Sequence, residues 1–167
     1  ASLLRRLRGD FRAGGCGHVL ALLRLDLMVR PGIAAPVARF YADTFGASVR
    51  DSVLGKEVLT EMGQVVAFHE SAEAPPPDAY DRDPDLAIHV CFYVDPFESI
   101  ATEVQQRGLF WVNPAYVGPP INDNVVSVAD AHASKQFRMK RVGPWVLEHE
   151  IRSFEHKWAP RGLKIGR

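Results

Sequence analysis

The feature that most constrains the fold of this chain is an order of elements that occurs twice. Each half reads as a strand and a helix followed by further strands, three in the first half and four in the second. From Asp26 in the first opening strand to Gly46 at the end of the first helix is 20 residues. The matching interval in the second half, from His89 to Gly108, is 19 residues. A repeat with this order and spacing predicts two βαβββ modules.

The elements follow from two periodicities, alternation for strands and a 3.6-residue repeat for helices. In the first module we expect strands at 22–29, 48–54, 57–62 and 64–70, and a helix at 34–46. In the second we expect strands at 87–94, 109–113, 125–129, 135–142 and 145–152, and a helix at 96–107. The predicted fold class is α+β, with the paired modules forming one curved mixed sheet and both helices outside it.

The predicted domain spans residues 21–152, with modules at about 21–70 and 86–152. A linker rich in proline and aspartate, 71–85, joins the modules, and pairing within one chain or between two chains remains open. Residues 1–20 form a basic amphipathic arm and residues 153–167 a basic tail. A chain of 167 residues suits one such domain.

Composition excludes several classes of protein. Lys and Arg together number 20, as do Asp and Glu, so a nucleic-acid binder driven by bulk positive charge is not expected. Two cysteines, Cys16 and Cys91, cannot make a disulfide framework. No run of 18 apolar residues is present to span a membrane. The glycine cluster at 14–17 lacks the lysine and hydroxyl residue of a phosphate-binding loop.

The N-terminal arm carries the strongest charge imbalance. Residues 1–24 hold five arginines against the single acid Asp10, and Leu3, Leu4, Leu7 and Phe11 share one helical face. This pattern is typical of a transit peptide, of a helix lying on a membrane or partner, or of a helix capping its own domain. We expect both arms to pack on another subunit or a membrane-embedded complex. An organelle, plastid or mitochondrion, is the favoured location, with bacterial cytoplasm as the alternative.

Three segments together resemble the vicinal oxygen chelate superfamily, which includes glyoxalase I, extradiol dioxygenases and bleomycin resistance proteins. The segment 37–46 (VARFYADTFG) is similar to that family's first helix. The segment 88–95 (IHVCFYVD) is similar to the strand that opens its second module, and 145–150 (WVLEHE) to its closing strand. The resemblance covers residues 20–152 and implies the same paired fold.

The resemblance also implies a metal site on the floor of a cup, with ligands from the opening and closing strands of each module. The matching positions are Asp26 (where the family usually has histidine), Phe68 or His69, His89 and Glu148, with Glu150 as the alternative to Glu148. Glu148 is the catalytic residue if the protein is an active enzyme. The implied cofactor is a divalent Fe, Zn, Ni or Mn ion, or none. Alternation places these residues on the polar strand faces, but it leaves 64–70 ambiguous.

Three functions remain open at this point. The first is a metal-dependent lyase, isomerase or dioxygenase acting on a small oxygenated substrate, and the second is a metal-free small-molecule binding protein. The third, which we favour, is a non-catalytic or weakly catalytic accessory subunit of a larger, organellar, membrane-associated complex. Asp26 in place of histidine favours it, because this carboxylate can instead pair with Arg24, Arg30 or Arg138. The two basic arms favour it as well.

Overall fold

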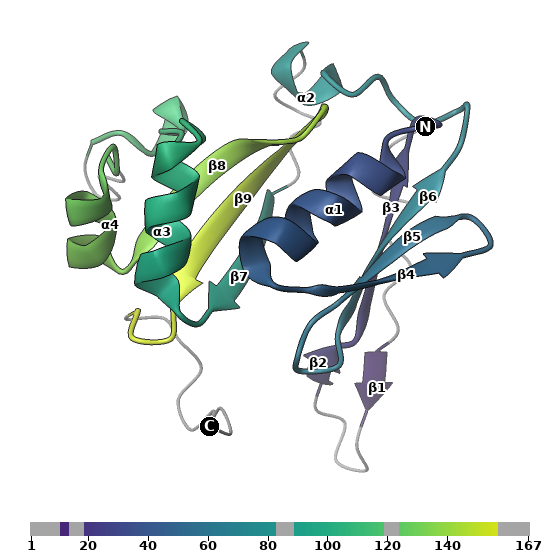
Figure 1. The fold of residues 1–167 in the computed structure, drawn as a ribbon, viewed down its shortest axis with the longest axis horizontal. Coiled ribbons are helices and arrows are strands. Elements are labelled where there is room, and N and C mark those ends of the chain that lie inside the picture. The colour runs from purple at the N-terminus through teal and green to yellow at the C-terminus, as the bar shows by residue number, and fades with distance from the viewer. Residues whose placement is uncertain (1–10, 14–18, 83–88, 119–123, 157–167) are drawn as a thin grey trace. The chain divides into compact units, whose positions relative to one another are not determined.

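The structure is a computed structural model that describes residues 11–13, 19–82, 89–118 and 124–156 (Figure 1). The chain divides into two compact units. The first contains the residues up to 86 together with 142–146, and the second contains 87–141 and the residues from 147 onward. Residues 142–146, which belong to the second predicted module, fall in the first unit.

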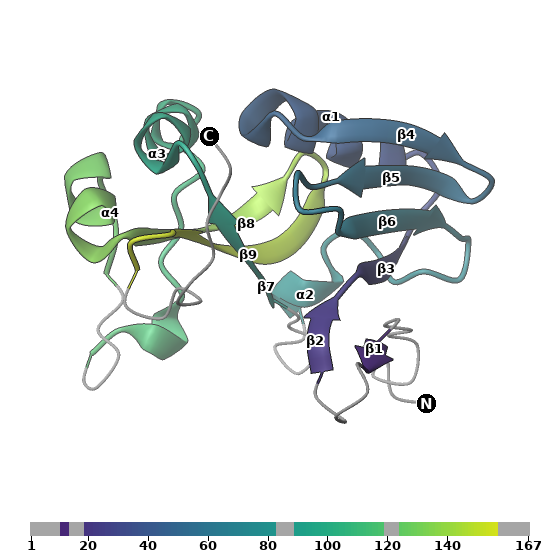
Figure 2. The same ribbon diagram turned by 90° about the horizontal axis from the view of Figure 1, so that it is seen from below.

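The first unit is built on a four-stranded mixed sheet in the order β3-β6-β5-β4, which Figure 2 shows from below. β3 and β6 are parallel, and the other two pairs are antiparallel. The elements are β3 (Arg24–Val29), α1 (Ala34–Phe45), β4 (Ser48–Ser52), β5 (Gly55–Leu59) and β6 (Val65–Glu70). A separate antiparallel pair, β1 (Phe11–Ala13) with β2 (Val19–Leu22), precedes them, and the short α2 (Ala79–Arg82) follows them.

Helix α1 covers one face of this sheet because its apolar residues recur at helical spacing. Val37 and Tyr41 are buried, and the Tyr41 ring lies 5.7 Å from the ring of Phe68 on β6. Phe68 also contacts Trp145 edge-on at 5.7 Å. The helix ends where predicted, at Gly46, whose φ of 65° suits glycine. The apolar core therefore takes one sheet face, and polar side chains are left on the other.

Gly55 sets the close approach of β5 to β6. Its φ is +151°, and a Cβ built there would lie 2.2 Å from the backbone oxygen of Phe68. We expect Gly55→Ala to lower the free energy of unfolding by about 1–3 kcal/mol more than the control, because its Cβ would clash with the backbone of Phe68, measured by urea denaturation. Gly63→Ala is the matched control, since Gly63 also has a positive φ but no atom within 4 Å of its built Cβ. Equal losses in the two variants would contradict the steric explanation.

The second unit has a three-stranded sheet in the order β7-β9-β8. β7 and β9 are parallel, and the two-residue turn at 143–144 between β8 and β9 requires an antiparallel pair. The elements are β7 (His89–Val94), α3 (Phe97–Gln106), the 3-10 turn η3 (Pro114–Tyr116), α4 (Val128–Ser134), β8 (Gln136–Val142) and β9 (Trp145–Ser153). Phe137 on β8 packs between Phe97 of α3 and Phe110, at ring separations of 5.6 and 5.0 Å.

The predicted order of strand, helix and three strands is confirmed in the first unit, whereas in the second only β8 and β9 follow α3 as strands. Three local corrections apply. The strand expected at 109–113 is a single bridge from Phe110 to Met139. The strand expected at 125–129 is wrong: Ser127 caps α4 instead, its hydroxyl accepting the backbone N–H of Asp130 at 3.1 Å. Phe11, placed on a helix by the sequence, lies in β1. Arm residues 1–10, 14–18 and 157–167 lie outside the described residues.

Among the helices that the structure describes, none combines the length and hydrophobicity needed to cross a membrane.

Candidate functional site

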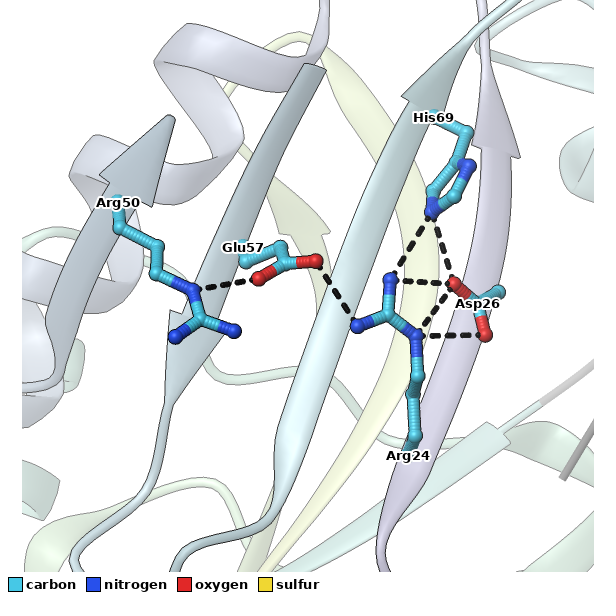
Figure 3. Close-up of polar contacts among 5 residues, drawn as sticks. All are labelled: Arg24, Asp26, Arg50, Glu57 and His69. Atoms are coloured by element: carbon cyan, nitrogen blue, oxygen red, sulfur yellow. Dashed lines mark hydrogen bonds and ion pairs between the residues drawn. The ribbon is translucent and has the colours of Figure 1, made fainter. Parts of the chain in front are cut away.

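The polar face of the first sheet carries a row of charged side chains across its strands (Figure 3). Asp26 on β3 and Glu57 on β5 both have Ala67 of β6 as their register partner, so the two acids flank a residue with a very small side chain. This small side chain leaves room over β6 for a bridging group. Arg24, two residues before Asp26 on β3, provides that bridge.

Arg24 binds both acids at once. Its Nε lies 2.9 and 3.0 Å from the two Asp26 carboxylate oxygens, and its Nη1 lies 2.8 Å from Glu57 Oε1. His69 Nε2 is 2.8 Å from Asp26 Oδ1, and Arg50 Nε is 2.6 Å from Glu57 Oε2. Acids and arginines therefore alternate along the row from Asp26 to Arg50, and His69 contacts its Asp26 end (Figure 3). The predicted pairing of Asp26 with an arginine is present, and the partner among the three candidates is Arg24.

The pKa of Glu57 is lowered by the two arginines that flank it. Hydrogen bonds from Arg50, and then from Arg24, hold its pKa below the ordinary value of 4.5. The ionised form is thus favoured by folding, and its contribution to stability is lost as the pH falls from 4.5 through the lower folded pKa. We expect NMR titration of Glu57 to give a pKa below 4.5 and Arg50→Ala to raise it. An unchanged Glu57 titration in Arg50→Ala would contradict this assignment.

The polar face of the second sheet carries the other predicted ligands. His89 on β7 lies directly opposite Glu148 on β9, and Cys91 lies opposite Glu150. In a parallel pair, register partners point to the same face, so His89, Glu148 and Glu150 share it. Glu148 and Glu150 are buried, whereas His89 is exposed.

One arginine again joins two acids in this unit. Arg138 Nη1 lies 2.5 Å from Glu148 Oε1, and its Nη2 lies 3.1 Å from Glu150 Oε2. Its guanidinium carbon lies 4.6 Å from the centre of the Tyr116 ring, a cation–π contact. Asn113 Nδ2 donates to the second Glu148 oxygen at 2.9 Å, and Arg152 Nε donates to Glu150 at 2.7 Å. The acids are therefore neutralised and fully hydrogen-bonded where they are buried.

The structure brings the predicted site residues together in two pairs, one in each unit. Asp26 contacts His69 in the first, and His89 lies opposite Glu148 in the second. Phe68, the alternative to His69, is buried in the core and has no donor atom. The ambiguous strand 64–70 thus turns His69, not Phe68, toward the polar face.

As arranged, these residues do not fit a divalent metal ion. The carboxylate oxygens that a metal would need are held by Arg24 in the first unit and by Arg138 in the second. In the first unit, the residue at the register position that Glu148 occupies in the second is Ala67, which has no ligand atom. Within the described ranges, no cluster of three or more His, Cys, Asp or Glu side chains could hold a metal.

Sequence reasoning missed Glu57, Asn113 and the true partners of Arg138. A signal existed for Arg138, which alternates with the apolar Phe137 and Met139 and so had to point to the polar face. Glu57 alternates in the same way with Val58. Nothing in the sequence marked Asn113, because it lies in an irregular segment.

Comparisons with known proteins show the fold. No family model matches the chain, and no curated protein matches it. Among solved structures, the oxidase ChaP-H2 is 18% identical, with 84% of this chain and 98% of that one covered and a TM-score of 0.56. A glyoxalase/dioxygenase from Nostoc punctiforme is 14% identical, with coverages of 84% and 97% and a TM-score of 0.54. The oxidase ChaP-H1 is 19% identical, with coverages of 81% and 96% and a TM-score of 0.55. The chain therefore has the paired βαβββ fold of the glyoxalase, or vicinal oxygen chelate, superfamily.

Proposed function

We propose that this protein is a glyoxalase-fold accessory subunit of a larger assembly, with no metal-dependent catalysis of its own or only a weak activity. One observation carries the proposal: in each unit a single arginine pairs with a carboxylate at an expected ligand position, Asp26 or Glu148, and also with a second acid. The network neutralises these acids without a metal ion.

The chemistry of a guanidinium differs from that of a metal ion. A metal ion activates a substrate oxygen or a water molecule through open coordination positions and a high local charge. Arginine accepts no hydrogen bond, does not lose its proton in proteins and offers only N–H donors. Several donors of Arg24 and Arg138 are already engaged by acids of this chain. These arginines therefore stabilise the sheets, and this favours a structural role.

The accessory role rests on the two arms of the sequence. The N-terminal arm and the C-terminal tail are both rich in Lys and Arg, and the first also has an apolar face. A partner with an acidic surface would attract them, and the affinity would fall as salt screens the charges. Attachment to an organellar membrane complex is the setting that this composition favours.

The test is elemental analysis combined with a sizing column on protein purified from its native source at low salt. We expect the chain to elute in an assembly far larger than its 18.5 kDa and without a stoichiometric divalent metal. Deletion of residues 1–20 should release the chain from the assembly. Elution as a free monomer, or one metal ion per chain, would overturn the proposal.

A second candidate is an active divalent-metal enzyme acting on a small oxygenated substrate. It is favoured by the register of β7 and β9, which places His89 opposite Glu148. In that case Glu148→Gln should remove the metal from the purified protein, because the ligand carboxylate is lost, and should abolish activity. Protein that holds no metal before the substitution would argue against this candidate.

A further inference from the structure

The row of charges on the first sheet ends with an arginine at the edge of the sheet. Asp26 on β3 and Glu57 on β5 are register partners of the same residue on β6, and Glu57 is in turn the register partner of Arg50 on β4. Arg24 reaches over β6 and pairs with both acids. Arg50 is the last member of the row, because β4 is the last strand of this sheet.

The guanidinium of Arg50 has hydrogen-bond donors that the row does not use. Its Nε lies 2.6 Å from Glu57 Oε2, and this is its one polar contact within the described part of the chain. Figure 3 shows its two Nη atoms without a partner among the residues drawn, and the side chain is 56% exposed. A guanidinium pairs most strongly with a carboxylate. Arg50 therefore offers an unfilled position for an acid.

The backbone of β4 can also accept a partner. Among the described strands only β5 pairs with it, so the other edge of β4 presents main-chain N–H and C=O groups to the outside (Figure 2). Such an edge is a template for a further strand. Val49 on β4 is 39% exposed, and Val53 and Leu54 in the turn after it are 101% and 56% exposed. An added strand would thus gain main-chain hydrogen bonds and apolar contacts together.

We propose that β4 is a docking edge for an extended segment of another protein, which adds a fifth strand to the sheet and places an acid opposite Arg50. That acid continues the alternation of acids and arginines by one position. The inference rests on the proposed function, because an accessory subunit needs a surface for its partner. It names such a surface outside the two arms.

A second copy of this chain does not supply the acid. Residues directly opposite one another on paired strands share a sheet face, and residues two apart on one strand do so as well. A copy that continues the same face through its own β4 can therefore present only Ser48, Arg50 or Ser52 to Arg50. None of these is an acid, and Arg50 opposite its own copy is repulsive. The occupant is therefore a different chain with an acid in an extended segment.

The test is an NMR titration of the full chain with two synthetic peptides, acetyl-TKEVT-amide and acetyl-TKKVT-amide. Paired antiparallel with 48–52, they differ only in the residue opposite Arg50. We expect shifts of the backbone amide signals centred on β4, and a dissociation constant at least about fivefold lower for the glutamate peptide. Arg50→Gln should remove this preference and Arg50→Lys should keep it. Arg39→Gln, which removes an exposed arginine of α1, is the matched control and should leave it unchanged.

The inference is overturned if the β4 amides respond to neither peptide at about 5 mM. Equal binding of both peptides by the wild type also overturns it, and so does a preference that persists in Arg50→Gln. A shift of the same signals with protein concentration alone would make the occupant a second copy and is equally fatal. The proposed function fails separately, through metal or a free monomer in the natively purified wild-type protein.

Discussion

Replacement of Arg138 by alanine is expected to lower the free energy of unfolding by about 3–5 kcal/mol. The variant leaves Glu148 and Glu150 buried with less compensation, since Arg138 pairs with both acids whereas Arg152 pairs with Glu150. It also removes the cation–π contact with Tyr116 and leaves a cavity. Urea denaturation at pH 7 in metal-free buffer measures the loss.

The control for this prediction is Arg141→Ala, an exposed arginine on the same strand, for which we expect a change within about 0.5 kcal/mol. A double variant that also replaces Glu148 by leucine should recover part of the stability, because apolar replacements of both partners of a buried pair are often tolerated. A loss below about 1 kcal/mol in Arg138→Ala would show that Arg138 does not compensate the buried acids.

Much of the fold was predictable because local patterns fixed it. The alternation of 24–29 and the helical spacing of 34–45 are local patterns that need no tertiary information. A glycine follows the helix at 46, and glycine readily adopts the positive φ at which helices end. The repeat of this order in 89–106 supported the same architecture twice. The capping signal at Ser127 and Asp130 was also present in the sequence, but the neighbouring valines suggested a strand.

The pairing within the candidate site was less predictable. The register between strands far apart in the sequence decides which acid an arginine meets, and alternation gives only the face. Arg24 reaches Glu57 because Ala67 lies between β3 and β5, which depends on the strand order. The face of 65–70 was ambiguous because both sides contain apolar residues. Packing of Phe68 against Tyr41 and Trp145 decides it.

The buried side chain of His149 is expected to make the stability of the fold sensitive to acid. This residue is completely buried on β9, its ring stacks on Phe92 at 5.9 Å, and its Nδ1 lies 2.8 Å from the backbone oxygen of Leu147, which accepts the hydrogen bond. Burial lowers its pKa from 6.5 to about 4, because the charged imidazolium is poorly solvated there. Sequence reasoning gave this histidine no role, since its environment appears only in the folded chain.

The sign of the pH effect follows from proton linkage. Between pH 6.5 and 4 the unfolded chain binds a proton at His149 that the folded chain does not bind. The free energy of unfolding therefore decreases as the pH is lowered through this window. This difference between the two pKa values corresponds to a loss of stability of about 3 kcal/mol, which is nearly complete at pH 4.

His149→Leu should therefore reduce the loss of stability between pH 7 and pH 4 by about 3 kcal/mol, measured by urea denaturation at each pH. His132→Leu is the matched control, because it removes an exposed histidine and leaves the buried ring of His149 in place. If both variants flatten it equally, the acid sensitivity does not come from the buried ring.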